Sequence, residues 1–299
     1  MDKLKNLKAV CYGEVLWDVF ANEKKIGGAP LNVALRMRAM GCDAAMISCV
    51  GNDQDGQDII NHIEKQGLNT GGIIKTKDYP TGVVQVFVNE RGSASYEISY
   101  PSAWDKIVLN DHARNLVKEA DVLIYGSLIC RDVVSKNALE ELIAYDVYKV
   151  FDVNLRKPFY SIAVLEDLMH AADFVKFNDE ELLEISAGMG SSHTLLEDNM
   201  EFMAKHVNIK AMCVTKGKHG ATLMWNGELY HSNGYPITVA DTVGAGDSFL
   251  AALVTGLLSG DEPQRSIETA CAVGALVAGE PGANPYISKE QIDEIMLKV

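Results

Sequence analysis

DVLIYG (residues 121–126) and KVFDV (residues 149–153) are short apolar runs, and an amphipathic stretch at residues 131–144 lies between them. Runs of five or six residues rich in Val, Ile and aromatic side chains are typical of buried strands. A strand, a helix and a second strand in this order predict two parallel strands joined by a crossover helix. This unit favours an α/β fold.

The same alternation continues through most of the chain. Further strands are expected at residues 9–13, 44–50, 173–177 and 211–215. Helical patterns occur at residues 30–41, 54–66, 161–171, 179–187, 195–207, 247–259 and 263–279. Together they predict an α/β fold of three layers (α/β/α), with helices on both faces of a mostly parallel central sheet and a single domain over residues 1–299.

One region departs from this rhythm. Residues 72–99 contain GIIKT, GVVQVFVNE and ASYEIS, in which polar and apolar positions alternate around a glycine-containing turn. Such a pattern predicts a hairpin. The segment EVLWDVF (residues 14–20) alternates too, so we infer a small antiparallel β sheet, a discontinuous lid from about residues 13–27 and 72–103. It could exclude water from a site, or it could be an ordinary edge hairpin.

Composition restricts the partners. The chain has 27 Lys and Arg against 41 Asp and Glu, a net charge of −14, which argues against nucleic acid and against anionic membranes as partners. No apolar run approaches the length of a membrane span and no signal peptide is evident. The six cysteines form no C-x-x-C pair, as expected of free thiols in the cytoplasm.

The most informative stretch is YPITVADTVGAGDSFLAALVTGLLSG (residues 235–260). The small residues Gly244, Ala245 and Gly246 precede an apolar helix, so their amides and the helix dipole can bind an anion. Asp247 lies beside that site, where the dipole favours its ionised form and where it can accept a proton from an alcohol. The simpler alternative is a tight turn in which Asp247 caps the helix.

A second candidate site is GGAPLNVALRMRAMG (residues 27–41). Gly28 allows close backbone approach, and Asn32 can both donate to and accept from a sugar hydroxyl. Asp18, an acid in an otherwise apolar strand, could hold vicinal hydroxyls. The alternatives are a solvated Asn32 and an outward-facing Asp18. No P-loop and no complete G-x-G-x-x-G is present, which argues against a dinucleotide-binding oxidoreductase.

GGAPLNVA and DTVGAGDSFLAAL resemble the two signatures of the PfkB carbohydrate kinases, the ribokinase-like family, and the resemblance covers about residues 9–290. It implies a ribokinase-like fold, a sugar lid at residues 72–99, and ATP and Mg²⁺ as cofactors. It also implies that Asp247 is the catalytic base and that residues 244–246 form the anion hole.

Other roles are implied by the same resemblance. Asp18, Gly28 and Asn32 match sugar-binding positions, and Arg156 lies in a D-x-N-x-R stretch. The nucleotide-site positions are Asn178 and Glu181 (an N-x-x-E motif that binds Mg²⁺ through water), Thr215, Gly217 and Asn284. Without the resemblance, the NDEE sequence around Glu181 would be interpreted as an exposed helical turn. Asp241 matches the carboxylate that binds a monovalent cation such as K⁺ in some members, although Tyr286 replaces a frequent small Ser.

Within the family, GEVLWD and PSA (residues 101–103) are most similar to fructokinases, which implies fructose as the sugar, although Trp104 stands where PSAD is frequent. A 2-keto-3-deoxygluconate kinase remains open, because Arg156 could bind a carboxylate, as do a ribokinase and a nucleoside kinase. From another class, a non-catalytic sugar-binding regulator is the alternative, but an intact Asp247 argues against it. A homodimer through the lid is also conceivable.

Overall fold

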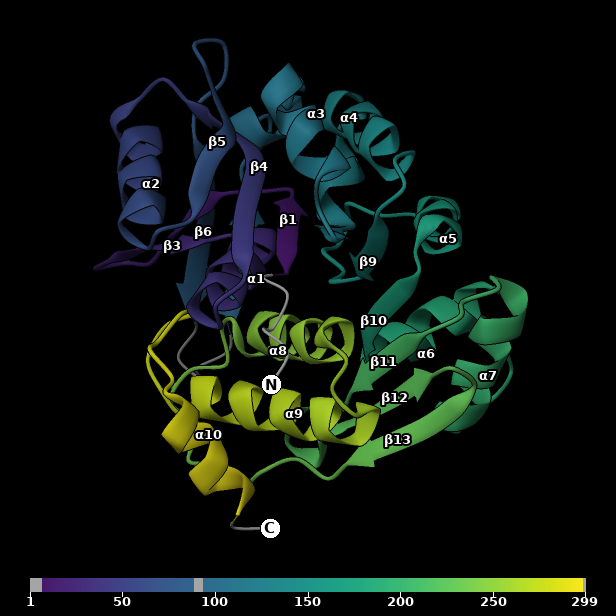
Figure 1. Cartoon of the computed structure of the whole chain (residues 1–299). Coiled ribbons are helices and arrows are strands. Elements are labelled where there is room, and N and C mark those ends of the chain that lie inside the picture. Colours follow the sequence, from purple (N-terminus) through teal and green to yellow (C-terminus); the bar gives the residue numbers. More distant parts are fainter. Residues whose placement is uncertain (1–6, 89–93, 298–299) are drawn as a thin grey trace.

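The computed structural model describes residues 7–88 and 94–297 (Figure 1). The strands of its central sheet are β1 Lys8–Tyr12, β4 Asp43–Gly51, β5 Asn69–Thr76, β8 Val122–Gly126, β9 Tyr148–Asp152, β10 Phe174–Asn178, β11 Met212–Thr215, β12 Ala221–Trp225 and β13 Glu228–Ser232. Their order is β13-β12-β11-β10-β9-β8-β1-β4-β5. The strands from β11 to β5 run parallel, and β12 and β13 add an antiparallel edge.

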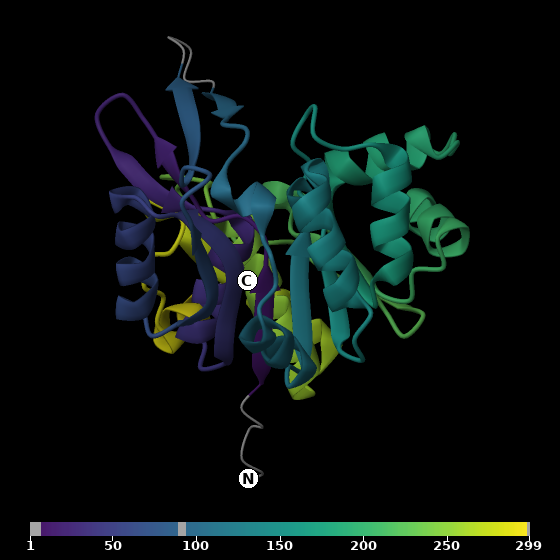
Figure 2. The same ribbon diagram turned by 90° about the horizontal axis from the view of Figure 1, so that it is seen from above.

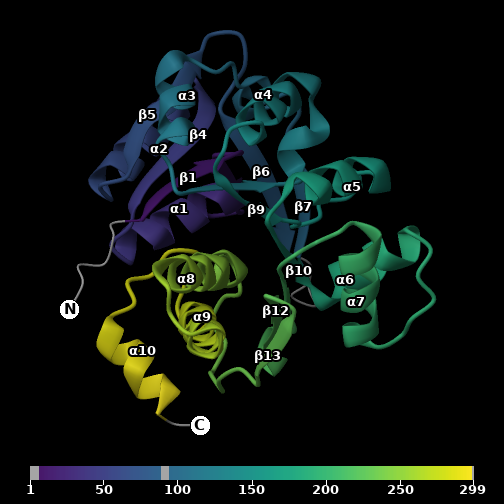
Figure 3. The same cartoon turned by 45° about the vertical axis from the view of Figure 1, so that its right-hand side comes forward.

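The helices are α1 Ala29–Ala39, α2 Gln54–Lys65, α3 Asp111–Lys118, α4 Val133–Ile143, α5 Ile162–Ala171, α6 Asp179–Gly188, α7 Leu196–His206, α8 Ala245–Ser259, α9 Pro263–Ala278 and α10 Lys289–Met296. Side chains alternate along each strand, so Ala9 and Cys11 belong to the apolar cluster that includes α1, α8 and α9, while Val10 and Tyr12 belong to the cluster that includes α3 to α7. Figure 3 shows α8 and α9 on one face of the sheet, with α6 and α7 on the other. The predicted three-layer architecture is confirmed.

The strands and helices predicted from the sequence are all present, most within one or two residues of their expected ends. Two helices, α3 and α10, and the hairpin of β12 and β13 were not predicted. Among the described helices, none has both the length and the apolar character needed to cross a bilayer.

A second, smaller sheet consists of β2 Leu16–Val19, β3 Lys24–Gly27, β6 Gly82–Val88 and β7 Ala94–Ile98, in the order β3-β2-β6-β7. Its outer pairs are antiparallel, as predicted, whereas the central pair of β2 and β6 is parallel. Leu16, Val84 and Val86 form its apolar core. Figure 2 shows this sheet projecting from the central sheet, on the side where β1 ends.

The predicted start of the hairpin is wrong. Residues 72–76 belong to β5, which pairs in parallel with β4 at the edge of the central sheet. An edge strand and a lid strand both expose one face, so their sequence patterns are the same. The predicted glycine-containing turn around residues 89–93 lies outside the described residues.

Polar residues gather at the carboxyl ends of the parallel strands. Glu14 follows β1, Asp152 ends β9, Asn178 ends β10 and Thr215 ends β11. In open α/β sheets this edge is where ligands bind. The small sheet projects on the same side, so the fold brings both sets of predicted site residues to one edge.

Candidate active site

Asp247 is the third residue of α8. The N-cap is Gly244, whose φ of 75° is accessible mainly to glycine, and no side chain caps the helix. A Cβ at Gly244 would lie 2.5 Å from the carbonyl oxygen of Ala283, so the C-terminal loop packs closely against this turn. The simpler interpretation is therefore wrong in its helix cap, although the tight turn that it expected is present.

Asn32 connects the catalytic candidate to two other segments. Its Nδ2 donates to Asp247 Oδ2 at 2.8 Å, and its Oδ1 accepts from Asn284 Nδ2 at 2.7 Å. Asn32 lies in the first turn of α1, whose N-cap is Gly28 with a φ of 114°. A side chain at Gly28 would collide with the backbone carbonyl of Glu14, so this glycine lets α1 start against the end of β1.

Burial changes the acidity of Asp247. Desolvation, with repulsion from Asp152, raises its pKa from 3.8 to about 6, against the opposing effects of Asn32, Lys176 and Arg156. The helix dipole was expected to lower the pKa of Asp247, but desolvation has the larger effect and raises it. The carboxylate is still mostly ionised at neutral pH, and a pKa closer to 7 suits a general base.

Asp18 and Arg156 are the predicted sugar-binding residues outside the Asp247 network. The Asp18 carboxylate lies over Gly27, where any side chain would collide with it. Burial raises the pKa of Asp18 to about 6, and Arg156 opposes this rise. Arg156 itself is exposed and makes no ion pair within the described residues; its guanidinium donates to the Leu155 carbonyl.

The predicted nucleotide residues lie at the ends of β10 and β11, where Asn178 and Thr215 are register partners. Asn178 and Glu181 form a capping box, and Glu181 also accepts from the Leu155 amide at 2.9 Å. Glu181 is 7% exposed, so the alternative of an exposed acidic turn is wrong at this residue. Gly217 has a φ of 53°, which explains a glycine there.

Asn284 has a different neighbourhood from the one implied by the resemblance. Its side-chain amide contacts Asn32 beside Asp247, and a role at the adenine stays a prediction. Asp241 accepts from the amides of Val243 at 3.0 Å and Gly282 at 3.2 Å, and so joins the two loops that the cation site would need.

The residues are compatible with Mg²⁺ held mainly by the nucleotide. The described chain contains no group of three or more His, Cys, Asp or Glu able to hold a metal ion. Mg²⁺ usually keeps several waters and binds through one or two carboxylates plus phosphates. Both oxygens of Glu181 already accept backbone amides, which favours contact with a hydrated ion through water.

Several buried polar residues of the site were missed by sequence analysis. Lys176 and Asp152 form an ion pair of 2.9 Å between β10 and β9. Burial lowers the pKa of Lys176, but the carboxylates of Asp152, Glu181 and Asp247 outweigh it, and the pKa lies above its ordinary value.

Two further buried residues support the same region. Arg36 donates to Ser248 Oγ at 3.0 Å and to the Pro285 carbonyl at 2.9 Å, and so connects α1, α8 and the C-terminal loop. Glu14 is 4% exposed, and burial raises its pKa to about 7. The available signals for this group were a charged residue at the end of a predicted buried strand or inside a helix, and the place of Asp152 in the D-x-N-x-R stretch.

The departure at Trp104 has a structural explanation. The neighbouring Asp105 is fully buried and forms two hydrogen bonds with Arg131, of 2.7 and 2.8 Å. The Arg131 guanidinium stacks on the Trp104 ring at 3.9 Å. The acid of this segment is therefore engaged in a structural ion pair and is not presented to a sugar.

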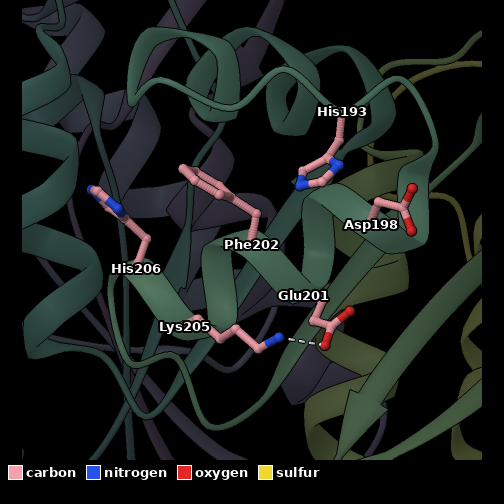
Figure 4. A pocket seen from close by; sticks show the side chains of 6 residues that line it. All are labelled: His193, Asp198, Glu201, Phe202, Lys205 and His206. Atoms are coloured by element: carbon pink, nitrogen blue, oxygen red, sulfur yellow. Dashed lines mark hydrogen bonds and ion pairs between the residues drawn. The ribbon is translucent and has the colours of Figure 1, made fainter.

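A surface pocket of about 380 Å³ lies elsewhere, on α7 and the segment before it (Figure 4). It is lined by His193, Asp198, Glu201, Phe202, Lys205 and His206. Phe202 stacks on His206, and Glu201 pairs with Lys205. None of the site residues above contributes to it, so we do not assign the chemistry there.

Comparison with known sequences decides the family. The profile described as pfkB family carbohydrate kinase matches residues 2–290. The chain belongs to this family. A Pyrococcus horikoshii protein described as a sugar kinase is 33% identical over 81% of this chain and 76% of its own length. Its crystal structure in complex with ATP has a TM-score of 0.81 at 27% identity, covering 96% of this chain and 99% of that one.

Two further relatives of this chain are named for different sugars. The fructokinase of Solanum tuberosum is 27% identical over 92% of this chain and 87% of its own length. The 2-dehydro-3-deoxygluconokinase of Thermoproteus tenax is 24% identical over 99% and 92%. The protein is thus an ATP-dependent sugar kinase with a ribokinase-like fold, as the sequence predicted.

Proposed function

We propose that this kinase transfers the γ-phosphate of Mg·ATP to a primary hydroxyl of fructose. The observation that carries the proposal is the convergence of Asp247, Asn32 and the turn of residues 244–246 at the start of α8. In this arrangement a base, an amide that can bind a hydroxyl and an anion site lie together. The similarity to fructokinases supports fructose as the acceptor.

In the proposed reaction the sugar lies beneath the small sheet, between Asp18 and Asn32, and its hydroxyl faces Asp247. Asp247 accepts the hydroxyl proton as the oxygen attacks the γ-phosphorus, and the amides of residues 244–246 stabilise the developing charge. Gly28 lets α1 start against the end of β1, which places Asn32 beside the proposed sugar site. Closure of the small sheet, the proposed lid, would exclude water.

The nucleotide would bind along β10 and β11. We assign the Mg²⁺ and phosphate contacts to Asn178 and Glu181, through water, and the nucleotide contacts to Thr215 and Gly217. We assign to Asn284 a contact with the nucleotide in addition to its hydrogen bond with Asn32. We assign to Asp241 the binding of a K⁺ ion between the loops that contain Val243 and Gly282. Because its cysteines are free thiols, which persist in reducing compartments, we expect the enzyme to act in the cytoplasm. We also propose that it forms a homodimer through the lid.

One observation favours a second acceptor, 2-keto-3-deoxygluconate. Arg156 is an exposed guanidinium without an ion-pair partner in the described chain, and it acts on the pKa of Asp18 and Asp247. A cation so placed could bind a substrate carboxylate. The relative from Thermoproteus tenax is consistent with this alternative.

The test is an ATP-consumption assay with fructose, ribose, 2-keto-3-deoxygluconate and nucleosides, followed by Arg156→Ala on the best acceptor. We expect fructose to give the highest kcat/KM and to change little in the Arg156 variant. If only the acidic sugar is phosphorylated, and the variant loses about 10²-fold or more as expected of a charge-assisted contact, fructose is the wrong acceptor.

A further inference from the structure

A buried ion pair lies directly beneath the proposed anion site. Lys176 and Asp152 are register partners on β10 and β9, and both are less than a tenth exposed. Replacing a buried ion pair by apolar residues is often neutral or stabilising, so such a pair is weak evidence for a role in stability alone. The position of this ion pair beside the proposed anion site is therefore better evidence for its role than its contribution to stability.

Gly246 shows where the ammonium lies. A Cβ on Gly246 would lie 3.7 Å from the Lys176 Nζ. The side of the turn that carries no side chain thus faces the lysine. As the second residue of α8, Gly246 also has an amide without a helix carbonyl to bond. A phosphoryl oxygen at this point would meet both donors.

The Lys176 ammonium has N–H groups that are available to a ligand. Its single hydrogen bond within the described chain goes to Asp152 Oδ1 at 2.9 Å, and an ammonium carries three N–H groups. Asp152 Oδ2 is buried and has no hydrogen-bond partner among the described residues. Both features are expected of a site that a ligand or its waters complete.

Charge gives a reason for a lysine here. Asp152, Glu181 and Asp247 all act on Lys176, which makes it one buried cation among three acids. The whole chain carries −14. A polyphosphate brought to this point meets repulsion, and a fixed buried cation stabilises the transferred group more than the same charge in water.

We propose that Lys176 is a catalytic residue whose ammonium, positioned by Asp152, donates to an oxygen of the transferred phosphoryl group from beneath the turn of residues 244–246. This inference rests on the proposed role of that turn. In the step, a bond forms from the sugar oxygen to the γ-phosphorus and the bond from that phosphorus to the bridging oxygen breaks. The electron pair leaves with ADP, the proton goes to Asp247, and Lys176 keeps its protons.

The test compares Lys176→Met with the double variant Lys176→Met/Asp152→Asn, in which neither partner of the ion pair carries a charge. The matched control is Lys106→Met/Asp132→Asn, which removes another Lys–Asp ion pair, of 2.6 Å, in which Asp132 is buried and Lys106 is partly exposed. Turnover, the KM for sugar and the affinity for MgADP with and without aluminium fluoride are measured, with folding checked by circular dichroism. We expect kcat and the extra affinity conferred by aluminium fluoride to fall about 10²–10³-fold in both Lys176 variants, while the KM for sugar and the control stay within about threefold.

Gly246→Ala is a second test that does not disturb the pair, because the methyl group would be in ordinary contact with Lys176. The variant should fold normally. It should lose affinity for aluminium fluoride, because the added methyl group would occupy the place of the phosphoryl oxygen. A folded double variant with turnover and aluminium fluoride affinity within about threefold of wild type, or a fully active Gly246→Ala, would overturn the proposal. Because the binding arm does not depend on turnover of the acceptor, absence of fructose turnover by the wild-type enzyme would contradict fructose and not the role of Lys176.

Discussion

Replacing Asp247 by Asn should inactivate the enzyme and stabilise it at the same time. The carboxylate is held in a site that disfavours its charge, as its raised pKa indicates. An amide of the same shape can still accept from Asn32, so the variant removes the charge and keeps the 2.8 Å hydrogen bond. The loss of a positioned base should lower kcat by about 10²–10⁴.

The size of the stabilisation follows from the pKa. A rise from 3.8 to about 6 corresponds to about 3 kcal/mol of unfolding free energy, since one pKa unit is about 1.4 kcal/mol. Asp247 keeps partial access to solvent, so this value is an upper limit and we expect about 1–3 kcal/mol. For a chain of this size the Tm should rise by about 2–5 °C.

The stability difference between Asp247→Asn and the wild type depends on pH. Between pH 3.8 and about 6 the native state holds a proton that the unfolded state has lost, so wild-type stability falls as the pH rises through this window. The advantage of Asp247→Asn should therefore be complete above about pH 7 and vanish near pH 4. Denaturant unfolding and kcat are measured across this range.

The matched control is Asp111→Asn, because Asp111 lies in the first turn of α3 with a fully exposed side chain. This variant should change the unfolding free energy by less than about 0.5 kcal/mol. If Asp247→Asn is less stable than wild type at neutral pH, or if its gain is independent of pH, the carboxylate is not the strained, desolvated base inferred here.

Three other expectations concern the same network and its supports. The kcat/KM of the wild type should fall steeply below about pH 6, as Asp247 becomes protonated; a flat profile from about pH 5 to pH 8 would contradict this. Asn284→Ala should lower kcat about 3–10-fold by releasing Asn32, whereas a change confined to the KM for ATP would indicate a nucleotide contact alone. Arg131→Met should cost about 3–5 kcal/mol of unfolding free energy, since Asp105 is left buried and unpaired; an unchanged denaturation midpoint would refute the importance of that ion pair.

The architecture and the central motif were predictable because their signals are local. The strand–helix–strand unit at residues 121–153 follows from apolar spacing alone. The turn before Asp247 needs small residues next to a helix, and that need is visible in the sequence. The place of residues 72–76 was not predictable, because an exposed strand has the same alternation in either sheet and only pairing with β4 decides between them.

The contacts that complete the site depend on pairing between distant segments. Asn284 meets Asn32 across 252 positions of sequence, and no periodicity encodes that distance. Lys176 and Asp152 stand in two runs that were predicted as strands, but their ion pair requires those strands to be neighbours in register. A charged residue in an apolar strand was a visible anomaly, while its partner could be identified only from the sheet order.

The net charge of the chain makes these local contacts necessary. An enzyme at −14 repels ATP at long range, so whatever attracts the phosphates must act at short range and in a poorly screened site. The amides at the start of α8 and the Lys176 ammonium meet that condition, because Gly246 and Lys176 face one another in the structure. Since such buried donors are already fixed before the phosphoryl group arrives, they need little reorganisation during transfer, which is what electrostatic stabilisation of a transition state requires.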